Sequence, residues 1–180
     1  YFNGTPEKSE GLFNKFIRHD VSGYQPGKSN EYTLRREQDE AVTKTAAYFT
    51  SHENSEFLWN AKPRFGKTLS AYDLVKRLGV TNVLVLTNRP AVANSWYDDF
   101  DQFIAGNTEY KFVSSTDSLK DRPSMSREQF IEYLSEHDAA KQITFISLQD
   151  LKGSKYFGGE YDKLKWVADL HWDLVIIDEA

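Results

Sequence analysis

Eight residues in the first half of the chain have the types and spacing of a phosphate-binding loop. They form the segment 61–68, with the sequence AKPRFGKT. A glycine here lets the backbone approach a phosphate closely, Lys67 can reach the β- and γ-phosphates, and the hydroxyl of Thr68 is a ligand for Mg²⁺. The free N–H groups at the start of a following helix also favour an anion. The chemistry of this segment is therefore the binding of a nucleoside triphosphate with Mg²⁺.

The same segment departs from the glycine-rich pattern of such loops. It begins with Ala61, and Pro63, Arg64 and Phe65 stand where small residues are usual. Pro63 has no N–H group to donate to a phosphate. On this motif alone, a simple turn between a strand and a helix remains an alternative.

An acidic pair near the end of the sequence has the chemistry to complete such a site. Asp178 and Glu179 follow the apolar run 174–177, about 110 residues after Lys67. At the carboxyl end of a buried strand, Asp178 would hold Mg²⁺ opposite Thr68, and Glu179 would polarise an attacking water. The alternative is two acidic residues that face solvent. The two motifs together favour the nucleotide site.

The segments between these motifs alternate between apolar strands and amphipathic helices. We expect helices over residues 36–51, 67–78, 90–104, 126–137 and 161–167, and strands over residues 56–60, 82–87, 110–113, 143–147 and 174–177. Gly79 is placed to end the second helix, and Ser126 with Gln129 forms a capping box. Continuous apolar strands that alternate with helices predict an α/β fold with a mostly parallel sheet and helices on both faces. Such sheets place their chemistry at the carboxyl ends of the strands.

Composition and charge narrow the class of protein. The chain has 180 residues, a formal net charge of −5 and no cysteine. It is long enough for one domain, and the missing cysteines exclude disulfides and suit the cytoplasm. The four histidines lie far apart in the sequence and do not have the spacing of metal ligands. No apolar run approaches the roughly 20 residues that a helix needs to span a membrane. Residues 1–32 carry several turn formers and predict an irregular strap, with a short helical turn at 12–17.

The ordered set of motifs resembles the first RecA-like motor domain of superfamily-two helicases and translocases, over residues 33–180. The segment 61–68 looks like motif I, and Ile177-Asp178-Glu179-Ala180 looks like motif II, the DEAD/DEAH box. Upstream, Leu34-Arg35-Arg36-Glu37-Gln38 resembles the Q-motif. The resemblance implies that Gln38 reads the adenine edge, and that Arg64, Phe65 and Gly66 line the nucleotide. An ordinary exposed helical glutamine is the alternative for Gln38.

Two further loops resemble the nucleic-acid contacts of that superfamily. Thr87-Asn88-Arg89-Pro90 looks like motif Ia, and Ser147-Leu148-Gln149 looks like the serine- or threonine-containing motif before the DEAD box. The resemblance implies that Arg89, Ser147 and Gln149 touch the sugar-phosphate backbone, which positions a strand without reading its sequence.

Within the superfamily, the chain looks most like the motor subunits of type I and type III restriction enzymes and related bacterial helicases. The resemblance implies an ATP- and Mg²⁺-dependent helicase or translocase with double-stranded DNA as the favoured track, and no membrane partner. It also implies a second RecA-like lobe in the same parent chain, which would supply arginine fingers. We therefore expect a piece of a longer protein, truncated after the DEAD/DEAH box and inactive alone. Arg64, Phe65 and Glu37 depart from the usual pattern, which leaves the subfamily open.

Two other classes of function remain open at this point. One is a P-loop switch or assembly ATPase that does not act on nucleic acid, and it would lack the second lobe. The other is a binding module with a degenerate loop that no longer admits a triphosphate. Mg-ATP would not shift the melting temperature of such a module.

Overall fold

The structure is a computed structural model that describes residues 30–178 of the chain. The strap expected over 1–32, with its helical turn, lies almost entirely outside the described residues, as does Glu179. Residues 30–35 form no helix or strand, and the Asn30 N–H donates a hydrogen bond to the Gln102 carbonyl at 2.7 Å.

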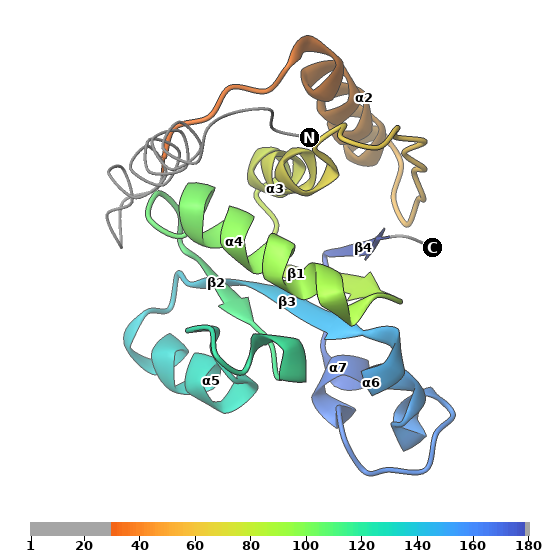
Figure 1. Ribbon diagram of the computed structural model, residues 1–180, viewed down its shortest axis with the longest axis vertical. Coiled ribbons are helices and arrows are strands. Elements are labelled where there is room, and N and C mark those ends of the chain that lie inside the picture. Colours follow the sequence, from red (N-terminus) through yellow and green to blue (C-terminus); the bar gives the residue numbers. More distant parts are fainter. Residues whose placement is uncertain (1–29, 179–180) are drawn as a thin grey trace, which may run out of the picture.

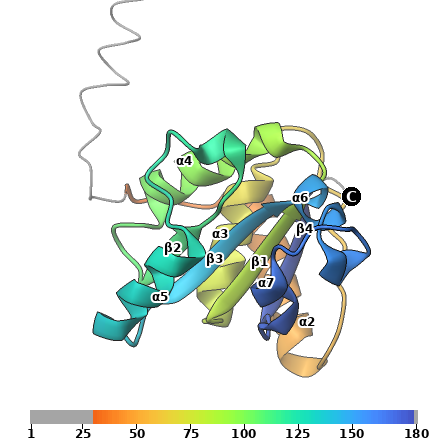
Figure 2. The same cartoon turned by 90° about the horizontal axis from the view of Figure 1, so that it is seen from below.

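Four parallel strands form one sheet in the order β2-β3-β1-β4 (Figure 2). They are β1 (Asn82–Thr87), β2 (Tyr110–Val113), β3 (Lys141–Ser147) and β4 (Leu174–Asp178). In this register Thr87 pairs with Ser147 on one side and with Asp178 on the other. The predicted parallel sheet is confirmed, and its carboxyl ends meet at one edge.

Helices cover both faces of the sheet, as the α/β pattern predicts (Figure 1). Two helices, α3 (Lys67–Leu78) and α4 (Ala93–Phe103), pack on one face, and α2 (Arg36–Ser51) packs on α3. The short 3₁₀ turn η1 (Pro90–Val92) precedes α4. The other face carries α5 (Arg127–Glu136), α6 (Leu148–Lys152) and α7 (Lys165–Asp169). The 3₁₀ turns η2 (Asp117–Leu119) and η3 (Lys155–Phe157) lie in the connections.

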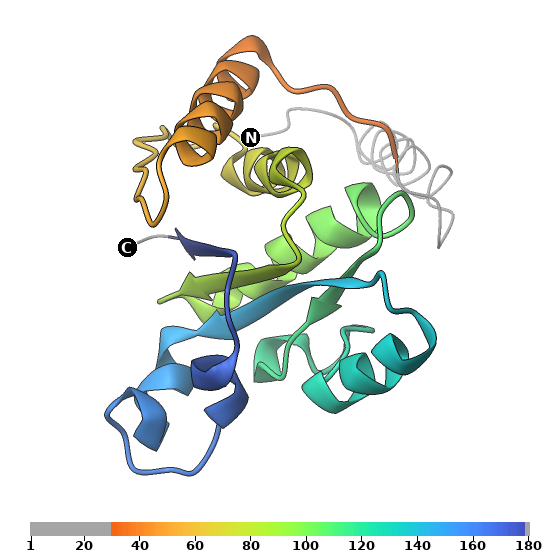
Figure 3. The same cartoon turned by 180° about the vertical axis from the view of Figure 1, so that it is seen from behind.

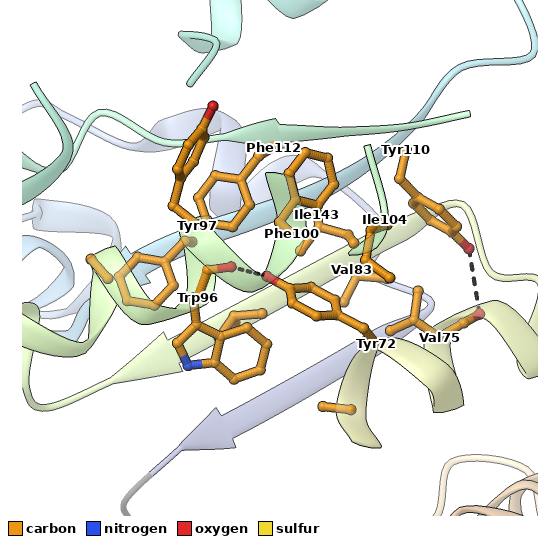
Figure 4. Close-up of a cluster of buried hydrophobic side chains, with 14 of the residues drawn as sticks. Tyr72, Val75, Val83, Trp96, Tyr97, Phe100, Ile104, Tyr110, Phe112 and Ile143 are labelled. Carbon is orange, nitrogen blue, oxygen red and sulfur yellow. Dashed lines mark hydrogen bonds between the residues drawn. The ribbon is translucent and has the colours of Figure 1, made fainter. Parts of the chain in front are cut away.

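The larger core fills the space between the sheet and the α3–α4 layer. Its aromatic centre includes Tyr72, Trp96, Phe100, Phe112 and Phe145, each at most 5% exposed. Figure 4 labels the first four of these residues. Burial of a large apolar side chain contributes roughly 1.5–3 kcal/mol, so this cluster fixes α3 and α4 firmly on the sheet. A smaller core on the opposite face joins β1 and β3 to α6 and α7.

Local signals place most element boundaries correctly. Helix α2 has the predicted bounds, and α3 ends at Gly79, whose left-handed conformation (φ +65°) lets its N–H bond the Val75 and Lys76 carbonyls. Ser126 caps α5 through the Gln129 N–H, and the Gln129 side chain bonds back to the Ser126 N–H.

The strand predicted over residues 56–60 is wrong. These residues have no regular secondary structure, and none of the strands in the described part of the chain pairs with them. The helix predicted over 161–167 is also displaced. Helix α7 begins only at Lys165, after Leu164 in a left-handed conformation (φ +59°). The short elements α6 and η3, which were not predicted, precede it.

The expectation that β4 is a fully buried strand is also wrong. Within the described residues β4 pairs only with β1, so it is an edge strand, and Val175 and Ile177 are 47% and 59% exposed. A cavity of about 320 Å³ is lined both by β4 and by the segment 57–61. In Figure 3 the connection that follows α2 lies beside β4. The segment that was expected to be a strand therefore lies beside the sheet without joining it.

Candidate nucleotide site

The segment 61–66 forms a compact loop before α3. Arg64 and Gly66 both adopt left-handed backbone conformations, with φ of +65° and +84°. Phe65 lies between them, and its N–H donates to the Lys62 carbonyl at 3.1 Å. A Cβ atom on residue 66 would lie only 2.5 Å from the Gln38 Nε2 atom, so this position needs glycine for both its conformation and its space.

The loop ends at the N-terminus of α3, where Gly66 is the N-cap and Lys67 and Thr68 open the helix. The first N–H groups of a helix have no intrahelical partners, and the helix dipole adds positive potential there. Lys67 is exposed and Thr68 is half-buried. The arrangement therefore provides N–H donors, an ammonium group and a hydroxyl at one helix end, which is the donor set that an anionic phosphate needs.

The carboxylate of Asp178 faces this helix end from β4. The Lys67 Nζ atom lies 3.5 Å from Asp178 Oδ1, and the Asp178 side chain is 13% exposed. The second oxygen, Oδ2, accepts a hydrogen bond from the Trp96 indole N–H at 3.0 Å. Residues that are about 110 positions apart in the sequence are thus brought together at the carboxyl edge of the sheet.

The chemistry of these side chains fits Mg²⁺. This ion takes oxygen ligands and is held by one or two carboxylates together with water and substrate phosphates. Asp178 supplies a carboxylate, and the hydroxyl of Thr68 supplies a further oxygen ligand. The described residues contain no cluster of three acidic, histidine or cysteine side chains that would bind a metal ion with protein ligands alone. Thr68 and Asp178 are therefore the residues that would hold the ion.

Gln38 holds the phosphate loop from the side of α2. Its side chain is 5% exposed. The Nε2 group donates to the Gly66 carbonyl at 3.3 Å and to Ser70 Oγ at 3.2 Å. The Oε1 atom accepts from the Arg35 N–H at 2.9 Å and from Arg35 Nε at 3.3 Å. All the hydrogen-bonding capacity of the amide is thus used within the protein.

Arg35 adds a second connection between α2 and the loop. Its guanidinium group donates to the carbonyl of Arg64 at 3.1 Å and also to that of Phe65. These bonds turn both carbonyls towards α2. Arg35, Arg64 and Phe65 also line a cavity of about 570 Å³ between α2 and the segment 57–65. Gln38 does not line that cavity.

The residues expected to contact nucleic acid lie at the same edge of the sheet. Arg89 is in the loop after β1, Ser147 ends β3, and Gln149 is in the first turn of α6. Arg89 is exposed, and its N–H donates to Thr87 Oγ1 at 3.1 Å. Gln149 is also exposed, and its Nε2 group donates to the Asn88 carbonyl at 3.1 Å, which joins α6 to the loop after β1. Ser147 is 2% exposed, and its hydroxyl caps α6 and bonds Asp150.

Sequence reasoning missed two residues of this site. Arg35 stands three positions before Gln38 at the start of α2, so the N-cap pattern was visible, but its bonds to the loop span about 30 positions. Trp96 carries no local signal at all, because its bond to Asp178 joins residues 82 positions apart.

Comparisons with known proteins identify the family of the chain. Residues 31–180 match the family model described as the type III restriction enzyme res subunit. A protein from Mycoplasma pneumoniae, named as the C-terminal part of a type II restriction enzyme and methyltransferase, is 29% identical over 154 residues. The match covers 82% of this chain and 20% of that relative.

No solved structure matches the chain. Among the residues that the structure describes, no helix is both long and apolar enough to cross a membrane. With its parallel α/β sheet, its phosphate loop and the family match over residues 31–180, the chain belongs to the type III restriction enzyme res subunit family, as a superfamily-two helicase motor domain of RecA-like fold.

Proposed function

We propose that this chain is the ATP-binding lobe of an ATP-dependent DNA helicase or translocase that serves a restriction-modification system. The observation that carries the proposal is the pairing of Lys67 with Asp178, 3.5 Å apart, at the N-terminus of α3. An ammonium group and a carboxylate at a helix start, on the carboxyl edge of a parallel sheet, are arranged to share a phosphate and its metal ion.

Each residue of the site has a separate task in this proposal. The N–H groups at the start of α3 and Lys67 bind the β- and γ-phosphates, and Thr68 and Asp178 hold Mg²⁺. When bound, Mg²⁺ neutralises charge that develops on the phosphate oxygens. Glu179 follows Asp178 directly in the sequence and takes the role of orienting the attacking water. Arg64, Phe65 and Gly66 enclose the phosphates.

Adenine recognition by Gln38 requires an exchange of partners. An amide can match the donor and acceptor of the adenine edge, but the Gln38 amide is occupied by Arg35, Gly66 and Ser70. We propose that the base displaces some of these bonds. The 570 Å³ cavity beside Arg35 and Phe65 has room for the ring, but Gln38 does not line it, so the Gln38 side chain must also turn towards the cavity to reach the base.

The proposed nucleic-acid track runs over the loop that holds Arg89 and the start of α6, which holds Gln149. Both side chains are exposed, and a hydrogen bond from Gln149 to the Asn88 carbonyl joins the two segments. Ser147 supports the same surface from beneath, as the N-cap of α6. We favour double-stranded DNA as the track, because the matched relative is named as a restriction enzyme and methyltransferase, and we place the protein in the cytoplasm.

Turnover in this proposal requires a second RecA-like lobe from the same parent chain. An arginine finger contributes about 10³ to 10⁵ in rate in comparable phosphoryl-transfer enzymes. The 180-residue chain by itself should therefore bind Mg-ATP weakly and hydrolyse it negligibly. Rapid turnover by this chain alone would contradict the requirement for a second lobe.

The test is ATP turnover by the full-length protein with no nucleic acid, double-stranded DNA, single-stranded DNA or RNA. We expect stimulation by double-stranded DNA, and loss of turnover in the Lys67→Ala variant. Lys67 is exposed, so this substitution should leave the melting temperature nearly unchanged. Turnover that no polymer affects would instead support a nucleotide switch that does not act on nucleic acid.

A further inference from the structure

We propose that Trp96 is a positioning residue for the carboxylate of Asp178, and that its indole N–H decides which carboxylate oxygen is presented to Mg²⁺. This inference rests on the proposed nucleotide-binding function. It assigns a role in that site to a residue of α4, a helix that contains none of the residues expected to bind nucleotide.

The contact distinguishes the two oxygens of Asp178. The Trp96 Nε1 atom lies 3.0 Å from Oδ2, whereas Lys67 Nζ lies 3.5 Å from Oδ1. An indole N–H can only donate, and a hydrogen bond to a carboxylate is among the stronger ones in proteins. Oδ2 is therefore committed to Trp96, and Oδ1 is directed towards the phosphate loop.

Trp96 is itself held rigidly. It is 2% exposed, and its ring meets that of Tyr72 edge to face, with centroids 5.3 Å apart. The Tyr72 hydroxyl donates to the Trp96 carbonyl at 2.6 Å. In Figure 4 the indole lies at the margin of the aromatic cluster, with its nitrogen directed away from the other labelled rings. A side chain fixed in this way orients its partner and does not simply follow it.

Asp178 needs such support because its own strand offers little. Among the described residues, β4 is paired on one side only, and Val175 and Ile177 are half exposed. The Trp96 bond connects the end of this strand to the layer of α3 and α4 that covers the sheet. Removal of a partner that orients a metal ligand in this way typically lowers the affinity for the metal roughly 10–100-fold.

The test is the Trp96→Phe substitution in the full-length protein, which removes the N–H and keeps an aromatic ring. The readout is binding of a fluorescent ATP analogue, titrated with Mg²⁺. We expect the Mg²⁺ concentration for half-saturation to rise about tenfold or more, with little change in binding of the analogue in EDTA. The rise in melting temperature that Mg²⁺ produces with ATP should shrink in parallel.

Tyr72→Phe is the matched control. It removes the hydroxyl that donates to the Trp96 carbonyl, but it keeps the ring that packs edge to face on the indole, and it leaves the indole N–H bond to Asp178 in place. It should lower stability without changing the Mg²⁺ requirement. If Trp96→Phe misfolds, replacement of Trp96 by 3-benzothienylalanine removes the N–H and preserves the shape of the ring, and the same shift is expected.

The outcomes separate the inference from the function on which it rests. If the Mg²⁺ concentration for half-saturation is the same in the Trp96 variants as in Tyr72→Phe, the inference is wrong, but the proposed nucleotide site is not contradicted. A wild-type protein whose binding of the analogue is independent of Mg²⁺, or absent, overturns both.

Discussion

Replacement of Gln38 by methionine tests whether α2 holds the phosphate loop. Methionine has a similar length and volume but cannot form hydrogen bonds of ordinary strength, so the substitution removes the bonds with little loss of packing. The amide bonds Arg35 through Oε1, and Gly66 and Ser70 through Nε2. All of these bonds disappear together.

The loss in the free energy of unfolding depends on which hydrogen bonds each partner of Gln38 keeps after the substitution. The Gly66 carbonyl still accepts from the Ser70 N–H at 3.1 Å and from Ser70 Oγ at 2.9 Å, and the half-exposed guanidinium of Arg35 can turn to water. The two long Nε2 bonds should each contribute at the low end of about 0.5–1.5 kcal/mol. Loss of the bond to the Arg35 N–H, which caps α2, adds about 1 kcal/mol. Together, the free energy of unfolding should fall by about 2–3 kcal/mol.

The assay is urea unfolding followed by tryptophan fluorescence, with Gln129→Met as the control. Gln129 occupies the same position in α5 and bonds the Ser126 N–H at 2.8 Å, but it is exposed, and its side chain makes no bond outside the helix start. Its loss should cost about 0.5–1 kcal/mol. If Gln38→Met is no more destabilising than Gln129→Met, the bonds from α2 to the loop do not stabilise the fold, and the reasoning fails.

Two further predictions concern Gly66 in the phosphate loop and the half-buried Asp99 in α4. Gly66→Ala should destabilise the protein by about 1–3 kcal/mol, since it combines a left-handed backbone with a Cβ atom 2.5 Å from Gln38 Nε2. Gly79→Ala is the control in melting experiments, because Gly79 is also left-handed but would have no atom within 4 Å of its Cβ; equal losses would show that the contact with Gln38 is relieved at no cost. Burial, with a smaller contribution from Asp98, raises the pKa of Asp99. The folded state therefore favours protonated Asp99, and this contribution to stability is lost as the pH rises through the raised pKa. Asp99→Asn should unfold at higher urea than wild type at pH 7, with a difference that shrinks towards pH 4, and a difference independent of pH would contradict this assignment.

The elements that the sequence by itself determined are those with local signals. Helix α3 ends at Gly79 because only glycine adopts that conformation without strain, and α5 begins at Ser126 because its side chain and that of Gln129 satisfy the first N–H groups. The apolar runs of β1 and β3 need burial on both faces, which required a parallel sheet covered by helices. Lys67 and Asp178 could be placed together because parallel strands end at one edge.

The tertiary structure alone decided what depends on distant partners. Residues 56–60 have the composition of a strand, but a strand also needs a neighbour to pair with, and none of the described residues provides one. The same pairing rule left β4 at the edge of the sheet and exposed Ile177. Trp96 reads in the sequence as one more core aromatic residue. Its bond to Asp178 exists only because the packing of α4 on the sheet brings an indole N–H within 3.0 Å of a carboxylate 82 positions away, and no local propensity encodes such a contact.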